Sequence, residues 1–406
     1  MSTSQPSRHE PFVLLPQLGK WLLIALVVAA LAGTASAGFL ESLDWATRTR
    51  ESHRWLLWCL PLAGFVVGWV YMRFGKDVEG GNNLIIEEIH DPRQTIPLRM
   101  APLILVSTVI SHLFGASVGR EGTAVQMGSS LGDQVARILR LRPEDRRIVL
   151  MAGISAGFGS VFGTPLAGAV FGMEVLMIGR MRYDALWPCF VAAIAADRVT
   201  ALWGVHHTHY AVAHIADVSL HSVAATLVAS VLFGLASMAF AEGAHRSGAF
   251  VKRHITYPPL RPLLGGAILA VVVWSTDGWR YIGLGIPTIV EALQQPVHPW
   301  DFAAKLVATV GSLATGFKGG EVTPLFYIGA TLGNALEPLL QMPVGSLAAL
   351  GFVAVFAGAT NTPLACTLMA IELFGAPIGV LAALACVVSF LASGHTGIYK
   401  SQRRGD

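Results

Sequence analysis

Long apolar stretches dominate the chain, and short polar connections separate them. Runs that approach the length of about 17 to 25 residues needed to cross a bilayer recur over residues 21–39, 55–72, 98–118, 148–178, 185–204, 218–241, 263–275, 302–316 and 324–393. Several of them are too short, or too interrupted by Gly and Pro, to cross as one straight helix. The pattern predicts an all-α polytopic membrane protein with broken and tilted helices.

The composition agrees with this class. Hydrophobic residues make up 53% of the 406 positions and charged residues only 13%, whereas a soluble domain has about 25% charged residues. The net charge of +3 is too small to indicate nucleic-acid binding. Basic residues gather in segments 137–147 and 400–406, and the positive-inside tendency makes both candidates for the cytoplasmic face.

No metal site or cofactor is predicted. The four cysteines are single residues in apolar surroundings, which is typical of small buried hydrophobic side chains rather than disulfides or a zinc site. The histidine-rich segment 206–214 has no acidic or cysteine partner nearby, so it does not predict a metal centre.

The N-terminal apolar run favours a membrane helix. It ends in Ala35-Ser36-Ala37, which could be a signal-peptidase site, but the polar segment 1–18 before it is long and the run itself reaches spanning length. We therefore expect a first transmembrane helix here.

An internal repeat divides the chain into two halves. Residues 119–123 (GREGT) match residues 319–323 (GGEVT), and residues 164–174 (TPLAGAVFGME) match residues 362–372 (TPLACTLMAIE), in the same order and at nearly the same offset. This predicts a first membrane repeat over 19–215, a second over 216–398, and a short polar C-terminus over 399–406. An inverted arrangement is favoured because it brings equivalent helix ends together near the bilayer midplane.

The glycine motifs are the places where helices are expected to break and bind an anion. A helix that begins there presents free backbone N–H groups and the positive end of its dipole. Glu121 and Glu321 occupy matched positions in the two motifs, and a carboxylate at membrane depth is a functional candidate. The alternative is compensation by a neighbouring cation, Arg120 for Glu121 and Lys318 for Glu321. We favour function for Glu121 and leave both interpretations open for Glu321.

Two further groups have a structural and a functional interpretation. Glu174 and Glu372 also match between the repeats, and the structural interpretation is favoured: they accept hydrogen bonds from backbone N–H groups and hold the fold. Asn82 and Asn83 follow a glycine turn, where they either satisfy turn backbone or offer uncharged donors to an anion. Tyr399, just past the last apolar run, is by default an interfacial anchor.

Taken together, the motifs resemble the CLC family of chloride channels and proton-coupled antiporters. The shared strings are GREG at 119–122, the second glycine motif up to Pro324, GSVFGTPLAGAVFGMEVL at 159–176 and TPLACTLMAIELFG at 362–375, in the family's order. The resemblance covers nearly the whole chain and implies a homodimer with one pathway in each protomer. The cytoplasmic regulatory domains of many eukaryotic members are expected to be absent.

Three departures separate this chain from the chloride-type members. Those members have Gly-Ser-Gly-Ile-Pro where this chain has Gly81-Asn82-Asn83-Leu84-Ile85, they have Pro at Thr123, and their proton-coupled forms have a second glutamate at Val175. The combination resembles the bacterial fluoride branch of the family, the fluoride/proton antiporters. The resemblance therefore implies a multi-pass protein of the bacterial inner membrane that confers fluoride resistance.

The resemblance also implies roles for individual residues. Glu121 corresponds to the gating glutamate, and Glu321 is our own candidate for proton transfer, since Val175 replaces the inner glutamate. The implied anion-binding residues are Asn82, Asn83, Gly119, Arg120, Gly122, Val322, Thr323 and Tyr399. Fluoride is small and strongly hydrated, and amide, hydroxyl and phenol donors can replace its water without a full charge that would trap it.

Other functions are less well supported. A chloride/proton antiporter or a passive anion channel, with chloride as the transported ion, disagrees with the residues at 82, 123 and 175. An intramembrane enzyme would need a nucleophile–base pair or metal ligands at spanning depth, and the matched carboxylates instead lie in duplicated glycine motifs. A cation-coupled solute transporter would leave the two anion-suited turns unexplained.

Overall fold

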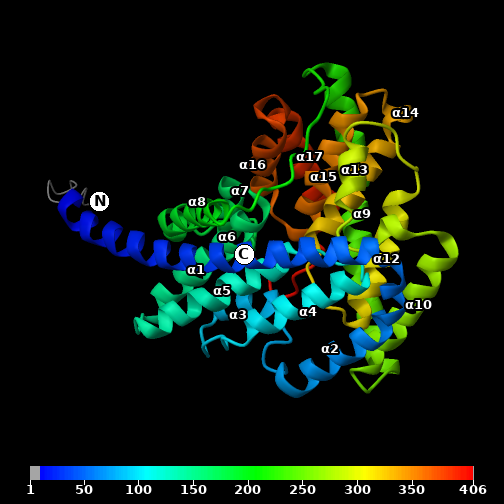
Figure 1. Ribbon diagram of the computed structural model, residues 1–406. Coiled ribbons are helices and arrows are strands. Elements are labelled where there is room, and N and C mark those ends of the chain that lie inside the picture. The colour runs from blue at the N-terminus through cyan, green and yellow to red at the C-terminus, as the bar shows by residue number, and fades with distance from the viewer. Residues whose placement is uncertain (1–9, 406) are drawn as a thin grey trace.

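The structure is a computed structural model that describes residues 10–405, and it is almost entirely helical (Figure 1). The first half contains α1 (Glu10–Ser52), α2 (Leu60–Phe74), α3 (Asn82–His90), α4 (Met100–Phe114), α5 (Glu121–Ile138), α6 (Pro143–Phe162), α7 (Pro165–Glu174) and α8 (Leu186–Leu202). The second half contains α9 (Leu220–His254), α10 (Leu260–Thr276), α11 (Ile286–Ala292), α12 (Asp301–Thr315), α13 (Val322–Ala335), α14 (Glu337–Leu340), α15 (Val344–Thr360), α16 (Pro363–Phe374) and α17 (Gly379–Ala392). The predicted fold class is confirmed.

The helices of the two halves correspond one to one in chain order, apart from the short α14. The predicted boundary at 215/216 falls in the connection between α8 and α9 and stays a prediction. Of the predicted polar segment 1–18, residues 1–9 lie outside the described residues, and α1 already begins at Glu10. The only strands among residues 10–405 are β1 (Met177–Ile178) and β2 (Arg403–Arg404), which pair in parallel.

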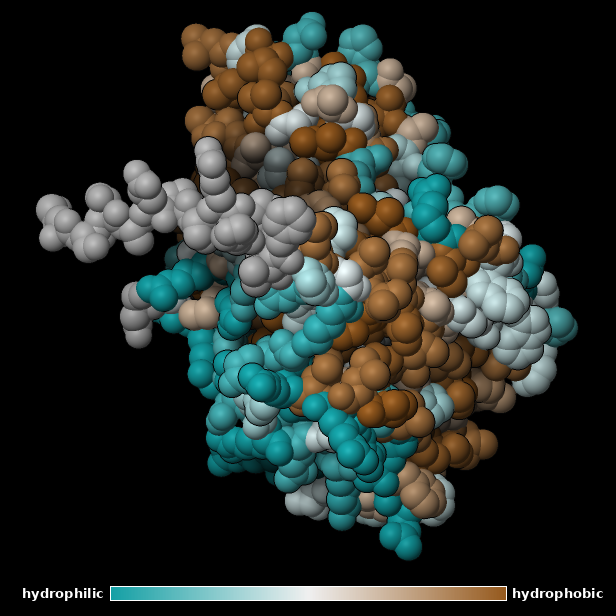
Figure 2. All heavy atoms as spheres, turned by 90° about the vertical axis from the view of Figure 1, so that its left-hand side faces the viewer, coloured by the Kyte–Doolittle hydropathy of each residue, from teal (hydrophilic) through white to brown (hydrophobic). Residues whose placement is uncertain are grey.

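The helix lengths match the expectation of broken helices. Four helical stretches are long and apolar enough to cross a membrane: Leu15–Ser52, Arg54–Phe74, Tyr183–Leu202 and Leu220–His254. Five further apolar helices have only 10 to 17 residues, and each therefore needs a neighbouring segment to complete a crossing. One side of the molecule presents a broad hydrophobic surface bordered by hydrophilic residues (Figure 2), as a membrane protein requires.

Equivalent local signals break the helices in both halves. Gly163 ends α6 with a φ of 76°, and Asn361 ends α15 with a φ of 57°, so both helices stop at a left-handed residue. A Thr-Pro pair follows each of them and starts the next helix with Pro at its first position. The duplicated "TPLA" strings are therefore two copies of one helix–break–helix element.

Phenylalanine side chains join the halves into one core. Phe158 and Phe162 of α6 lie against Phe356 of α15 and Phe326 of α13, with ring centroids 6.0 and 4.9 Å apart. All four rings are buried. Because the rings come from both halves, they form part of one shared core, and the segments between them are held at fixed distances.

Candidate functional site

The two duplicated glycine motifs cross each other in the middle of the protein. Gly119 N–H donates to the Gly320 carbonyl over 2.6 Å, and Gly320 N–H donates to the Gly119 carbonyl over 2.8 Å. A Cβ atom on Gly119 would lie 2.9 Å from the Gly320 oxygen, and one on Gly320 would lie 2.7 Å from the Gly122 nitrogen. Only glycine permits this approach. We call this antiparallel contact the glycine crossing.

Two helices begin at the glycine crossing and diverge from it. In Figure 1, α5 lies low and to the left in the molecule and α13 lies high and to the right. Their N-terminal N–H groups and positive dipole ends remain at the crossing, which makes it suitable for a negative charge.

The Glu121 carboxylate occupies the N-terminus of α13. Its side chain is completely buried, and both of its oxygens lie 2.7 Å from the Thr323 hydroxyl. The Thr323 N–H donates to one of them over 3.1 Å. Arg120 Nε lies 3.5 Å away, so the neighbouring cation contributes as well. A carboxylate of the first half thus accepts hydrogen bonds from the N-terminal donors of a helix of the second half.

Glu321 is placed differently from its counterpart. Its side chain lines a cavity of about 600 Å³ and, within residues 10–405, accepts no hydrogen bond from another side chain. The alternative of compensation by Lys318 finds no ion pair within residues 10–405: Lys318 Nζ lies 4.0 Å from the centroid of the Tyr71 ring instead. Glu321 is therefore a half-buried carboxylate that faces the cavity.

The inner end of the cavity is formed by polar side chains from four parts of the chain. Asn82, Gln126, Glu321 and Tyr399 all line it. A Cβ atom on Gly122 would meet Asn82 Nδ2 at 3.0 Å and Glu321 Oε2 at 3.6 Å, so the absence of a side chain at Gly122 lets both groups approach the start of α5. Asn82 Oδ1 is buried without a hydrogen-bond partner among the described residues.

The structure brings most of the predicted site residues together. Gly119, Arg120, Gly122, Val322 and Thr323 surround the glycine crossing, and Tyr399 is buried with only 6% of its surface exposed, so it is not an interfacial anchor. Asn83 has a structural bond: its Oδ1 accepts from Ser401 N–H over 3.1 Å. The anion-binding roles of all these residues stay predictions.

A C-terminal strap, residues 400–405, holds Tyr399 in position. Gln402 Nε2 donates to the carbonyl oxygens of Val175 and Thr360 over 2.8 and 2.7 Å, and its Oε1 accepts from Asn361 over 3.0 Å. Gln402 therefore ties the ends of α7 and α15 together, three residues after the tyrosine. No sequence signal indicated this residue. Gln126, also missed, could have been found because it lies one helical turn after Gly122.

Val175 borders a second, much smaller space of about 10 Å³. Asn82 and Tyr399 close one end, and the rest of its lining consists of the apolar side chains of Ile85, Ile86, Val125, Ile154 and Phe171. A water molecule needs about this volume but also two to four polar partners. The apolar wall makes this space a poor route for protons.

Glu174 and Glu372 cap helices across the boundary between the halves. Glu174 at the end of α7 accepts from the N–H groups of Leu364 and Ala365 at the start of α16, over 3.0 and 2.8 Å. Glu372 in α16 accepts from Leu166 and Ala167 at the start of α7, over 2.9 and 2.8 Å. The structural interpretation is confirmed for both.

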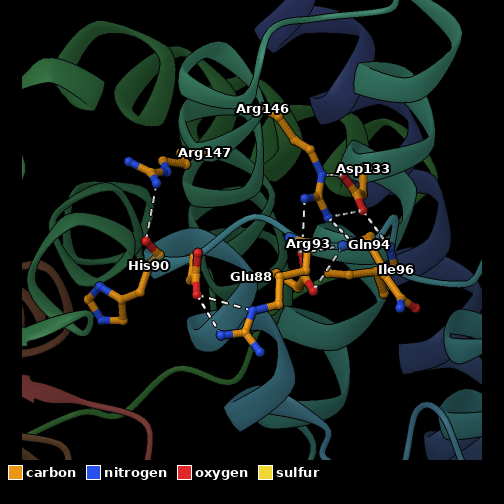
Figure 3. A network of polar contacts seen from close by, with 9 residues as sticks. Glu88, His90, Arg93, Gln94, Ile96, Asp133, Arg146 and Arg147 are labelled. Atoms are coloured by element: carbon orange, nitrogen blue, oxygen red, sulfur yellow. Dashed lines mark hydrogen bonds and ion pairs between the residues drawn. The ribbon is translucent and has the colours of Figure 1, made fainter.

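An ion network fixes α3, the helix that begins with Asn82 (Figure 3). Arg146 donates to Asp133 over 2.6 and 2.9 Å, to Glu88 over 2.9 Å and to the Gln94 carbonyl over 2.6 Å. Because Glu88 lies in α3 and Asp133 in α5, one guanidinium connects the two helices that meet at the inner end of the cavity.

The basic segments lie on one face of the protein. Arg147 donates to the His90 carbonyl, the His90 ring bonds to the Leu176 carbonyl, and Arg403 N–H donates to that same oxygen. Segments 137–147 and 400–405 are therefore neighbours, and Lys400 of the second segment lines the cavity.

A Gly-x-Ser-x-Gly string at 153–157 does not form a catalytic elbow. It lies within α6, and Ser155 Oγ donates to the Ala169 carbonyl over 3.3 Å. A nucleophilic serine of this motif needs a strand-to-helix turn.

Comparison with known proteins agrees with the geometry. The family model described as voltage gated chloride channel matches residues 63–394. A Pseudomonas syringae pv. tomato "chloride/fluoride channel protein" is 63% identical over 404 residues, 98% of this chain and 89% of that one. A Klebsiella pneumoniae "H(+)/Cl(-) exchange transporter ClcA" is 26% identical over 87% of this chain and 80% of its own length. The solved structure of a CLC-type fluoride/proton antiporter superposes with a TM-score of 0.92 at 33% identity, covering 99% of this chain and 100% of that one.

Proposed function

The chain belongs to the voltage gated chloride channel (CLC) family, and from this premise we propose that it is a fluoride/proton antiporter that exports fluoride in exchange for entering protons. The observation that carries the proposal is the Glu121 carboxylate on the Thr323 hydroxyl and N–H. The Glu121 carboxylate occupies the donors that we propose bind fluoride. It must take up a proton and leave before fluoride can bind there, and this couples the movement of the two ions.

The donor chemistry supports fluoride over chloride. Thr323 presents a hydroxyl and an amide at the same place, and Asn82 and Tyr399 at the cavity's inner end add an amide and a phenol. These are compact, strong donors that can replace the hydration of a small hard anion. Two relatives with fluoride in their names or titles are 63% and 33% identical to this chain. Chloride transport is the alternative.

In the proposed exchange, protonation of Glu121 removes its charge and weakens its hold on Thr323. Fluoride then takes the vacated donors, and Glu121 returns when it releases the proton. The Arg120 guanidinium, 3.5 Å from the Glu121 carboxylate, attracts the charged side chain and so helps to restore the starting position.

Glu321 is the proposed proton donor and acceptor on the cavity side. It faces the large cavity and accepts no side-chain hydrogen bond among residues 10–405. The space beside Val175 has an apolar wall, and this supports a route through the cavity rather than past the position of the missing inner glutamate.

We further propose a location and an assembly. The cavity shares its face with segments 137–147 and 400–405, so the positive-inside tendency favours a cytoplasmic opening in a bacterial inner membrane. The assembly is a homodimer in which each protomer has its own pathway, and the exchange gives the cell fluoride resistance.

The test is a flux measurement with the purified protein in liposomes loaded with fluoride or chloride, while internal pH is followed. Fluoride efflux with opposite proton movement and little chloride flux is the expected result. Equal chloride flux, or fluoride flux without proton movement, would contradict the proposal in favour of a general anion transporter or a channel.

A further inference from the structure

The large cavity carries more positive than negative side chains. Its basic lining residues are Lys76, Lys252, Arg261, Lys318 and Lys400, and its acidic lining residues are Glu79 and Glu321. A concave surface with an excess of one charge raises the local concentration of small ions of the opposite sign. General attraction of this kind does not define a site, however, because exposed charges are screened by salt.

Lys318 differs from the other four cations. Three of them, Lys76, Lys252 and Lys400, are exposed. The fourth, Arg261, donates a hydrogen bond from Nε to the Ile255 carbonyl. Lys318 is half-buried, and within residues 10–405 it forms no ion pair with a carboxylate. Its ammonium group is therefore partly sheltered from solvent and has no direct ion-pair partner among these residues.

Tyr71 fixes the ammonium group without neutralising it. The Tyr71 side chain is 7% exposed, and its ring centroid lies 4.0 Å from Lys318 Nζ. An aromatic ring holds a cation through its quadrupole, which leaves the net charge unchanged and the N–H donors available on the other side. A carboxylate at the same distance would have quenched the charge.

Lys318 lies in the loop that leads to the glycine crossing. Only Gly319 and Gly320 separate it from Glu321, and both Lys318 and Tyr71 line the cavity that ends at Asn82 and Tyr399. We propose that Lys318, held on the Tyr71 ring, is a capture site for a partly hydrated fluoride ion before the ion moves to the inner end of the cavity. This inference rests on the proposed function and adds a further substrate site to it.

The test compares Lys318→Met with the matched control Lys252→Met in fluoride efflux at graded fluoride concentrations. We expect Lys318→Met to raise the half-saturating fluoride concentration by about tenfold, with the maximal rate and the proton-to-fluoride ratio unchanged. Lys318→Arg keeps the cation and should behave like the unsubstituted protein. Lys252→Met should shift half-saturation by less than about twofold, because its charge is exposed.

Several outcomes would overturn the capture site. They are an unchanged half-saturation in Lys318→Met, an equal shift in Lys252→Met, or a lower maximal rate without a shift. Lys318→Gln repeats the test with a polar side chain, so that poor folding of the methionine variant cannot decide it. If the unsubstituted protein transports fluoride and the variants do not differ from it, only the capture site fails; if it does not transport fluoride, the proposed function fails.

Discussion

The two glycine motifs are copies of each other, yet their carboxylates have different surroundings. Glu121 is completely buried and bonded to Thr323 of the other half. Glu321 faces the cavity and has no such partner within residues 10–405. The threonines differ in the same way: Thr123 bonds to Thr108 of its own half over 2.8 Å, whereas Thr323 bonds across the glycine crossing.

By contrast, Glu174 and Glu372 have kept equivalent roles. Each accepts two backbone N–H groups at the start of the partner helix in the opposite half. Symmetry has persisted where the duplicated element holds the fold, and it is lost at the glycine crossing, where we propose that two ions are handled in sequence. On this proposal, asymmetry between matched residues marks function in this molecule.

The largest expected effect comes from Glu121→Gln. The amide keeps the size of the side chain but cannot exchange a proton, so coupled exchange should fall by about 100-fold or more. Fluoride efflux and internal pH, recorded together in liposomes, measure this. Coupled exchange at a normal rate in this variant would show that the carboxylate on Thr323 has no part in gating.

The equivalent change in the other half, Glu321→Gln, should be milder and of a different kind. We expect proton movement to fall by about tenfold relative to fluoride movement, since Glu121 would still bind and release at the glycine crossing. The same recordings give the proton-to-fluoride ratio. An unchanged ratio would eliminate Glu321 as the proton-transfer residue.

The sequence predicted the halves, the helix breaks and the meeting of the glycine motifs, because glycine turns and duplicated strings are local signals. It also indicated Glu121 and Thr323 as members of one site. The sequence could not predict the partner of Lys318, because the contact between Lys318 and Tyr71 depends on how α2 packs beside the α12–α13 loop. The Gln402 bonds were unpredictable for the same reason, since the bond from Gln402 to the Val175 carbonyl joins residues more than 200 positions apart.

Thr323→Val sharpens the comparison between the two threonines. It removes a hydroxyl that bonds to a charged group, which is worth about 1.5 to 3 kcal/mol, and fluoride affinity should fall by about tenfold or more. Thr123→Val is the matched control, and its hydroxyl bonds only to Thr108 among the described residues. Fluoride efflux over a range of concentrations compares them. Equal effects of the two changes would mean that the threonines do not differ in function.

The smallest effect on transport is expected from Glu174→Gln and Glu372→Gln, which test the symmetric pair. A glutamine keeps one acceptor oxygen but loses the charge, and its NH₂ group would face a backbone N–H. Each variant should therefore lose about 1 to 3 kcal/mol of stability. The bonds are alike in number and length, so the losses should be similar, with the proton-to-fluoride ratio unchanged.

Thermal inactivation of the purified variants, followed by size-exclusion chromatography, measures stability. A changed ratio in either variant alone would show that functional asymmetry extends from the glycine crossing to the α7–α16 caps, because a purely structural cap affects how long the fold survives and not how many protons accompany each fluoride ion.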